Sequence, residues 1–309
     1  MINTNFKSIH DLIKAFPDEQ TCIDHLTELR WNGNIISPFD SDSKVYVCKG
    51  NKYRCKNSCK YFNVRTGTLF DNTKIELKKW FLAIYIVTSH KKGISSLQLS
   101  RDIDVTQKTA WFMLQRIRNC FGINNDEKFD NNVEVDETYV GGKFANKSNS
   151  QRKEIHKYGV RTGADQKTPV LGILERDKRV EGMVIDKAYG KTIKPIIFDK
   201  INNSATVITD GFGAYHNIDR NFTKHVIVNH DKNEYAKGMY HTNTIEGFWS
   251  LLKRGIIGIY HFTSQKHLQK YIDEFTFRYN SRTNTTAQRF NLMLSNTEHR
   301  LTYKELINE

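Results

Sequence analysis

Apolar positions recur at helical spacing in the first part of the chain. Between Ile9 and Phe16 they fall three and four residues apart, and a second amphipathic stretch covers 22–29 after Pro17. Side chains at these intervals share one face of an α-helix. Residues 1–30 are therefore predicted to form a small helical lead-in.

The pattern changes to short strand-like pieces over residues 31–73. The segments VYVC and YFNVRTGTLF are interrupted by Gly, Asn and Lys, which predicts a compact β-ribbon. A ribbon of this size usually needs a metal, and the available thiolates are Cys48, Cys55 and Cys59. A zinc ribbon uses two closely spaced cysteine pairs, but here only Cys55 and Cys59 make a pair, and Ser37 and Asp40 stand where the upstream pair is expected. The segment is thus a degenerate zinc-ribbon-like ribbon, and structural Zn²⁺ is doubtful.

Residues 74–123 show a helical pattern. The apolar stripe of KIELKKWFLAIYIVTSHK precedes a short helix, a tight turn at 102–105 and a longer helix capped by Thr106. This order is typical of a helix-turn-helix unit, whose second helix enters the major groove by its N-terminal residues. The residues expected to contact DNA are Gln107, Lys108 and Thr109, followed on the same helix by Arg116 and Arg118. The alternative is a pair of packed helices with solvated basic residues.

Strand and helix patterns follow one another beyond a polar linker at 124–132. VEVDETYV alternates as a strand, TPVLGILERD and KRVEGMVID form a hairpin, KTIKPIIFDKI is helical, and ATVITD and KHVIVNH are strands. Helical patterns then cover 242–254 and 264–280. The order is three antiparallel-type strands, a helix, a strand, a helix, a strand and a terminal helix. It predicts an α/β fold, an RNase H-like mixed-sheet domain over 133–290 with a C-terminal tail at 291–309.

Composition and charge add the class of partner. The chain has 309 residues, 38% hydrophobic and 12% aromatic, which is enough for a sizeable core in two or three domains. Its 47 Lys and Arg against 34 Asp and Glu give a net charge of +13. A surface this basic favours a polyanionic partner, and nucleic acid is the leading candidate.

No targeting segment is evident in the sequence. The N-terminus lacks a cleavable apolar core, and the longest apolar run, Trp80 to Val87, is too short to span a bilayer. The protein is expected to be cytoplasmic and nucleoid-associated, without a membrane partner. Its five cysteines then indicate reduced thiols or metal ligands and not a disulfide framework.

Three acids stand at positions where they can converge. The first predicted strand of the mixed region ends in Asp136, the fourth ends in Asp210, and Glu246 lies on the late helix. Two Mg²⁺ ions clamp the attacking and leaving oxygens of a phosphodiester displacement, and such hard cations require several carboxylate oxygens. A single aspartate at a strand end more often caps a turn. The joint occurrence in this order is what predicts a metal site.

The segments that carry these acids resemble a known family. VEVDETYVGGK, ITDGFGAYH and HTNTIEGFWSLLKRGIIGIYHFTSQKHLQKYIDEFTFRYNSR look like the three signature blocks of the DDE transposases of bacterial insertion sequences. The similarity is to the insertion sequence family 1595 type, whose members carry an N-terminal zinc-ribbon-like segment. YFNVRTGTLFDNTKIELKKWFLAIY resembles the ribbon-to-helix junction of that subgroup, so the resemblance covers nearly the whole chain.

The resemblance implies a function and roles for residues. It implies an RNase H-like catalytic domain, dependence on Mg²⁺ with Mn²⁺ as a substitute, recognition of terminal inverted repeats, and a homo-oligomer of at least two chains on DNA. By position, Asp136 and Asp210 match the two aspartates of the family, Glu246 its third acid, and Lys253 its basic residue two turns later. Lys253 is then expected to bind a DNA phosphate, with Arg254 beside it, although a solvated lysine is the plainer interpretation.

Two other residues compete with Glu246 as the third metal ligand. Asn243 lies three residues before Glu246 and shares its helix face, and some relatives use asparagine or histidine in place of the acid, which makes His241 a competitor as well. Charge favours Glu246, because two divalent cations facing only Asp136 and Asp210 would leave the site with excess positive charge.

The sequence therefore predicts an enzyme that cleaves the ends of an insertion sequence and joins the 3′-hydroxyl to target DNA. Two alternatives remain open. One is an RNase H-like nuclease that cuts without strand transfer. The other is a non-catalytic helix-turn-helix regulator whose late domain only oligomerises.

Overall fold

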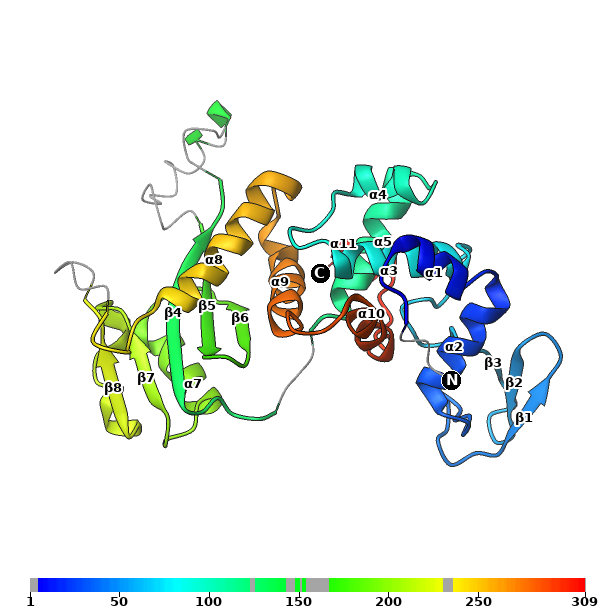
Figure 1. The fold of residues 1–309 in the computed structure, drawn as a ribbon, viewed down its shortest axis with the longest axis horizontal. Coiled ribbons are helices and arrows are strands. Elements are labelled where there is room, and N and C mark those ends of the chain that lie inside the picture. The colour runs from blue at the N-terminus through cyan, green and yellow to red at the C-terminus, as the bar shows by residue number, and fades with distance from the viewer. Residues whose placement is uncertain are drawn as a thin grey trace. The chain divides into compact units, whose positions relative to one another are not determined.

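The helices and strands separate into two units (Figure 1). Unit 1 combines Met1–Ile123 with Ser281–Glu309, and unit 2 is Asn124–Asn280. The computed structural model describes residues 5–122, 126–142, 148–150, 152–153, 167–229 and 236–308. The division differs from the expected boundary at residue 290, because the chain after Asn280 folds with the N-terminal part of unit 1.

Several helices of unit 1 begin where capping residues predict. Ser8 and Asp11 form a capping box at the first helix, and the side chain of Asp18 accepts a hydrogen bond from the backbone of Thr21 at the second. The first two helices occupy the segment predicted to be helical. The bounds are α1 Ile9–Ala15, α2 Glu19–Trp31, α3 Leu77–Ser89, α4 Ser96–Asp102, α5 Gln107–Asn119, α10 Thr286–Ser295 and α11 Tyr303–Asn308.

The core of the helical part of unit 1 is aromatic. Phe290 of α10 is fully buried, and its ring centroid lies 5.2 Å from that of Phe6, 6.0 Å from that of Phe16 and 5.3 Å from that of Phe81 on α3. The contacts with Phe6 and Phe16 join the end of the chain to its beginning. Helix α10 is therefore an integral part of unit 1.

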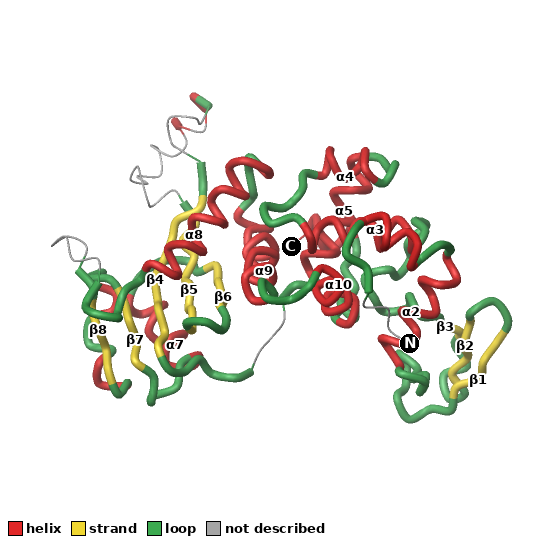
Figure 2. Tube along the Cα trace, in the orientation of Figure 1, coloured by secondary structure: helices red, strands yellow, loops and turns green. Residues whose placement is uncertain are grey.

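A three-stranded antiparallel sheet lies where the ribbon was predicted (Figure 2). Its strands are β1 Val45–Cys48, β2 Lys52–Cys55 and β3 Tyr61–Phe62. One face carries Tyr53 and Phe62, whose ring centroids lie 5.3 Å and 6.1 Å from that of Trp31 at the end of α2. This aromatic cluster gives the small sheet a core.

Unit 2 is built on a mixed five-stranded sheet in the order β6-β5-β4-β7-β8. The strands β4, β5 and β6 are antiparallel, while β7 and β8 run parallel to β4. The sheet confirms the α/β class. The bounds are β4 Asn132–Val140, β5 Thr168–Glu175, β6 Val180–Val184, β7 Thr206–Thr209, β8 Lys224–Ile227, α7 Gly190–Lys200, α8 Asn243–Gly255 and α9 Leu268–Asn280.

The connection between β7 and β8 differs from the expected order. The RNase H-like order placed a helix there, although no helical segment was assigned between ATVITD and KHVIVNH, and the structure has only two short 3-10 turns, Gly213–Tyr215 and Asp219–Asn221. Helix α8 begins at the predicted place, with Thr242 as its N-cap residue.

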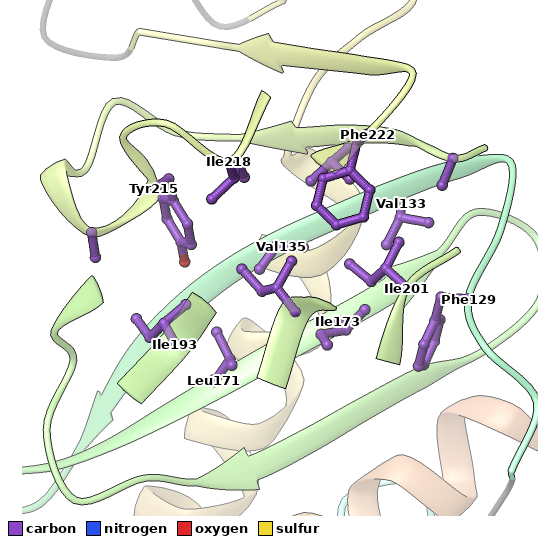
Figure 3. Close-up of a cluster of buried hydrophobic side chains, with 14 of the residues drawn as sticks. Phe129, Val133, Val135, Leu171, Ile173, Ile193, Ile201, Tyr215, Ile218 and Phe222 are labelled. Atoms are coloured by element: carbon purple, nitrogen blue, oxygen red, sulfur yellow. The ribbon is translucent and has the colours of Figure 1, made fainter. Parts of the chain in front are cut away.

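Two hydrophobic clusters cover the two faces of this sheet. Val133, Val135, Leu171 and Ile173 pack with α7 in the first cluster (Figure 3). The neighbouring positions of β4 and β5 supply the second cluster, which contains the apolar faces of α8 and α9. Alternation along a strand explains the division, since successive side chains point to opposite faces.

Within the part of the chain that the structure describes, there is no helix whose length and apolar character would let it cross a membrane.

Candidate active site

Asp136 and Asp210 lie beside each other at the centre of the sheet of unit 2. In the parallel pairing of β4 with β7, Val135 is opposite Thr209. Asp136 and Asp210 directly follow this pair, so they are neighbours on adjacent segments of the sheet. Asp136 does not end its strand as expected, because β4 continues to Val140. Asp210 directly follows β7, and its Oδ1 accepts a hydrogen bond of 2.9 Å from the backbone of Phe212.

The surroundings of Asp136 disfavour its charged form. Burial raises its pKa to about 7, and the nearby carboxylates of Glu137 and Asp210 add to this shift. The pKa of Glu137 is raised as well, first by burial and then by Asp210. Carboxylates gathered in this way are hard oxygen donors that a divalent cation would neutralise. Asp136 and Asp210 therefore fit a site for such a cation.

Glu137 is held on the opposite face of β4 from Asp136. The hydroxyl of Tyr215 donates a hydrogen bond of 2.6 Å to Glu137 Oε2, and Tyr215 itself is buried in the cluster packed against α7 (Figure 3). Burial, followed by the charge of Glu137, raises the pKa of Tyr215 well above its ordinary value. Sequence reasoning missed Tyr215, although it lies five residues after Asp210 in the ITDGFGAYH block.

Trp249 of α8 positions Asp136. Its indole Nε1 donates a hydrogen bond of 3.0 Å to Asp136 Oδ2. The approach depends on Gly172, which is opposite Asp136 on β5: a Cβ at this position would lie 2.4 Å from Cζ2 of the Trp249 ring. Gly172 thus provides the space through which the indole reaches the carboxylate.

A buried carboxylate fixes the start of α8 to the same strand. Glu134, two residues before Asp136, is fully buried, and its Oε2 accepts backbone hydrogen bonds of 3.1 Å from Thr244 and 3.0 Å from Ile245. These are N–H groups of the first helical turn, which lack partners inside a helix. An anion at this end is also favoured by the helix dipole.

Arg176 completes this attachment. Its Nε donates a hydrogen bond of 2.6 Å to Glu134 Oε1, and its Nη1 and Nη2 donate to the carbonyls of Met239 and His241. The guanidinium therefore ties the segment before α8 to the strand that carries Asp136. We refer to Glu134, Arg176 and the N-terminus of α8 as the α8 clamp.

Glu246 lies on the first turn of α8 and is exposed to solvent. Its Oε1 accepts a hydrogen bond of 3.0 Å from the hydroxyl of Thr242.

The other candidate residues of this region lie near Glu246 in the sequence. Asn243, Lys253 and Arg254 are exposed on the same helix, whereas His241 is half-buried beside Glu134. No three Asp, Glu, His or Cys side chains form a metal-binding group among the residues described. The structure thus brings Asp136 and Asp210 together and leaves Glu246 outside a three-acid cluster.

Comparisons with known proteins identify the family. The ISXO2-like transposase domain, a family of the insertion sequence 1595 type, matches residues 128–280. A protein of Halobacterium salinarum, described as an uncharacterized protein in transposable element ISH50, is 30% identical over 277 residues, which is 86% of this chain and 92% of that protein. The chain belongs to the ISXO2-like transposases. The family consists of DNA-processing enzymes, and the matched region coincides closely with unit 2.

The helices expected to bind DNA in this transposase have the predicted order. Helices α4 and α5 are joined by a short turn, and the side chain of Thr106 caps α5 by accepting from the backbone of Thr109. Gln107 and Lys108 are exposed at the start of α5, while Thr109 is half-buried.

Two arginines assigned to the DNA surface of the transposase are instead buried. Arg116 and Arg118 have exposed fractions of 5% and 1%. The guanidinium of Arg116 donates hydrogen bonds to the carbonyls of Leu301, Leu69 and Asp71, all within unit 1. The expectation that these arginines contact DNA is therefore wrong, because their helix face packs inward and Arg116 satisfies backbone carbonyls there.

The three cysteines that could supply thiolates to zinc do not converge. Cys48 is paired with Lys52 on the face of the ribbon sheet opposite to that of Cys55, and Cys55 is buried with its thiol 3.2 Å from the hydroxyl of Ser43. The neighbouring hydroxyls of Ser37 and Ser43 lower the pKa of Cys55 to about 6. Cys59 is exposed. The set Cys48, Cys55 and Cys59 therefore does not form one cluster of ligands, because alternation along β1 and β2 separates two of its members.

Proposed function

We propose that unit 2 is an RNase H-like DDE catalytic domain that cleaves the ends of an insertion sequence and joins the freed 3′-hydroxyl to target DNA. The observation that carries this proposal is the adjacency of Asp136 and Asp210 on parallel strands. The strand order, with an antiparallel meander followed by two strands parallel to β4 and helices on both faces, supports it. Family membership supports transposition as the process.

Asp136, Asp210 and Glu246 would hold Mg²⁺ or Mn²⁺, with Asn243 as the alternative to Glu246. Two such cations supply charge neutralisation at the phosphate and lower the pKa of the attacking water. Trp249 orients the carboxylate of Asp136 by its hydrogen bond. The α8 clamp sets the helix that carries Glu246 against the strand that carries Asp136. Lys253 and Arg254, exposed two turns later, would bind phosphates of the DNA.

The start of α5 would recognise the terminal inverted repeats as a helix-turn-helix unit. Gln107 and Lys108 are exposed at the end of the helix that enters the major groove in such units, with Thr109 beside them. Because an insertion sequence has two ends, the active species would hold at least two chains on DNA.

The test is a cleavage and strand-transfer assay on labelled duplexes that end in the repeats flanking the gene. We expect products with Mg²⁺ or Mn²⁺ and none with a chelator. Asp136→Asn and Glu246→Gln should abolish both steps and leave repeat binding intact, while Asn243→Ala should only slow them. Asp199→Asn, which removes an exposed carboxylate of α7, is the matched control and should remain active.

The outcomes separate the candidate functions. Cleavage without joined products would favour the nuclease, and binding without any nick in Mg²⁺ would favour the regulator. If Glu246→Gln still cleaved DNA and Asn243→Ala did not, Asn243 and not Glu246 would be the third metal ligand. Loss of repeat binding in Gln107→Ala or Lys108→Ala, by about 1–3 kcal/mol for a residue that reads a base edge, would support recognition by α5.

A further inference from the structure

The part of unit 1 that holds the strands β1, β2 and β3 carries positive charge without acidic residues. From position 43 to position 70 the sequence contains no Asp or Glu. Its basic residues are Lys44, Lys49, Lys52, Arg54, Lys56, Lys60 and Arg65. The chain as a whole has 34 acidic and 47 basic residues. The absence of acidic residues from positions 43–70 is therefore a local feature and not a consequence of the overall composition.

The strand register gathers four of these charges, Lys44, Lys52, Arg54 and Lys56, on one face of the sheet. Tyr46 is opposite Arg54, and Arg54 is opposite Tyr61, so the three side chains form a row across all three strands. Lys52 lies two residues before Arg54 on the same face, and Lys56 lies two residues after it. The opposite face is occupied by the aromatic core around Trp31.

This row of side chains is open to solvent. Tyr46 and Tyr61 are 42% and 61% exposed, so their rings are accessible to a partner. Two cations lie over their rings: Lys44 Nζ is 5.6 Å from the Tyr46 centroid, and Arg54 Cζ is 5.9 Å from the Tyr61 centroid. Within the residues that the structure describes, no carboxylate forms a salt bridge with Lys44, Lys52, Arg54 or Lys56.

We propose that this ribbon face binds DNA independently of sequence. We define the ribbon face as Lys44, Tyr46, Lys52, Arg54, Lys56 and Tyr61. Its cations would pair with phosphates of the DNA backbone, and such contacts release counterions without reading bases. Its exposed rings would pack against deoxyribose or an unpaired base, as aromatic side chains do in surfaces that bind nucleic acid without sequence preference.

This inference rests on the proposed function, because it assigns a second DNA contact to the same protein. It differs from the proposed role of α5, which is to recognise the repeat. The ribbon face would add affinity for flanking or target DNA of any sequence.

The test is binding of the full chain to a fluorescent duplex with a scrambled repeat sequence, measured by anisotropy over a range of salt concentrations. The variant is the triple substitution Lys44→Ala, Arg54→Ala and Lys56→Ala. The slope of log affinity against log salt should decrease by about 0.9 for each phosphate that the variant no longer neutralises. Affinity at low salt should fall at least tenfold.

The matched control removes the same charge elsewhere in unit 1, by Lys14→Ala, Lys91→Ala and Lys92→Ala, three exposed lysines outside the ribbon. It should retain nearly the affinity and salt slope of the parent protein. A second variant, Tyr46→Ala with Tyr61→Ala, keeps every charge and should weaken binding without changing the slope. Circular dichroism checks that each variant is folded.

Equal losses in the ribbon variant and the control would overturn the proposal, since net charge alone would then explain binding. Unchanged binding in the ribbon variant would also overturn it. Either result leaves the proposed function intact if the parent protein still cleaves repeat-ended DNA. Conversely, a parent protein that binds scrambled duplex through the ribbon face but never cleaves would reject the proposed function and retain this inference.

Discussion

Asp136 differs from most acids of this chain in being surrounded by groups that disfavour its charge. Burial, Glu137 and Asp210 raise its pKa, and the side chain that donates to it is a neutral indole. The sequence predicted that Asp136 and Asp210 lie close together, because strand alternation and element order can be read from the sequence pattern. Their role as metal ligands stays a prediction. The sequence did not predict Trp249 as the partner of Asp136, since these residues are 113 positions apart and their pairing depends on where α8 docks.

The hydrogen bond from Trp249 should matter more to activity than to folding. Trp249→Phe keeps a ring over Gly172 but removes the indole N–H that orients Asp136. With Asp136 in its proposed role as a metal ligand, loss of this outer partner should lower metal affinity or activity by about 10- to 100-fold. We expect a reduced cleavage rate in Mg²⁺, measured with repeat-ended DNA.

The control for this change is Phe248→Leu, which alters the adjacent buried ring of α8 without touching a donor to Asp136. It should lower the melting temperature while leaving the cleavage rate of the folded protein nearly unchanged. Equal rates for Trp249→Phe and the parent protein would show that Asp136 needs no such orientation.

Asp273 on α9 gives a prediction of pH dependence away from the candidate site. Burial raises its pKa from 3.8 to about 6, while Gln269 and Lys270 oppose the shift. An acid with a raised pKa holds its proton more tightly when folded, so stability is lost as pH rises from below about 4 to above about 6. Asp273→Asn removes the charge and keeps an oxygen for the 2.8 Å hydrogen bond from Gln269.

We therefore expect Asp273→Asn to be more stable than the parent at pH 7, by about 1–2 kcal/mol because Asp273 is only partly shielded from solvent. The difference should vanish below about pH 4, where both side chains are neutral. Urea denaturation at the two pH values measures it. A difference that is constant with pH would indicate a packing effect instead.

At the scale of elements, helix α8 is held to the sheet by interactions that its own sequence does not reveal. Its extent was predicted well, as 242–254 against the observed Asn243–Gly255, because its apolar face and basic last turn are local signals. Its attachment was not predicted, since Glu134 in the VEVDETYV strand appears from alternation alone to be an ordinary solvent-facing acid. Similarly, Arg116 and Arg118 appeared to be surface residues until the docking of their helix was known.

The α8 clamp should contribute strongly to the stability of unit 2. The carboxylate of Glu134 accepts hydrogen bonds from two backbone N–H groups and from Arg176. In Glu134→Gln the amide NH₂ group would face one of these N–H donors, so that hydrogen bond would be lost. Breaking a buried pair from one side costs about 3–5 kcal/mol. The free energy of unfolding of unit 2, measured by urea denaturation, should fall by this amount.

Glu181→Gln is the matched control for the clamp. Glu181 pairs with Lys200 at 2.8 Å, but both side chains are about one third exposed, and such surface pairs contribute about 0–1 kcal/mol. Similar losses for the two variants would mean that Glu134 is no more than an ordinary ion-pair partner.

At the scale of the whole molecule, the chain returns to its beginning after unit 2. The family match ends at residue 280, at the same place as unit 2, and α10 and α11 then fold with unit 1. The sequence could not predict this return, because the apolar face of α10 does not specify which distant surface covers it. Because α10 follows α9 closely in the sequence, the first part of α10 was assigned to the RNase H-like domain. In the structure the partners of Phe290 are Phe6, Phe16 and Phe81.

This organisation predicts which unit a substitution in α10 destabilises. Phe290→Ala removes a fully buried ring from the aromatic core of unit 1, and such a truncation costs about 3–5 kcal/mol. When thermal unfolding is monitored by calorimetry and by limited proteolysis, unit 1 should unfold at a lower temperature than in the parent protein. The unfolding transition of unit 2 should be unchanged. Leu292→Ala, at a 38% exposed position of the same helix, should change stability by less than about 0.5 kcal/mol. If Phe290→Ala destabilised unit 2 instead, α10 would belong to the core of unit 2, because loss of a buried ring weakens the unit in whose core that ring packs.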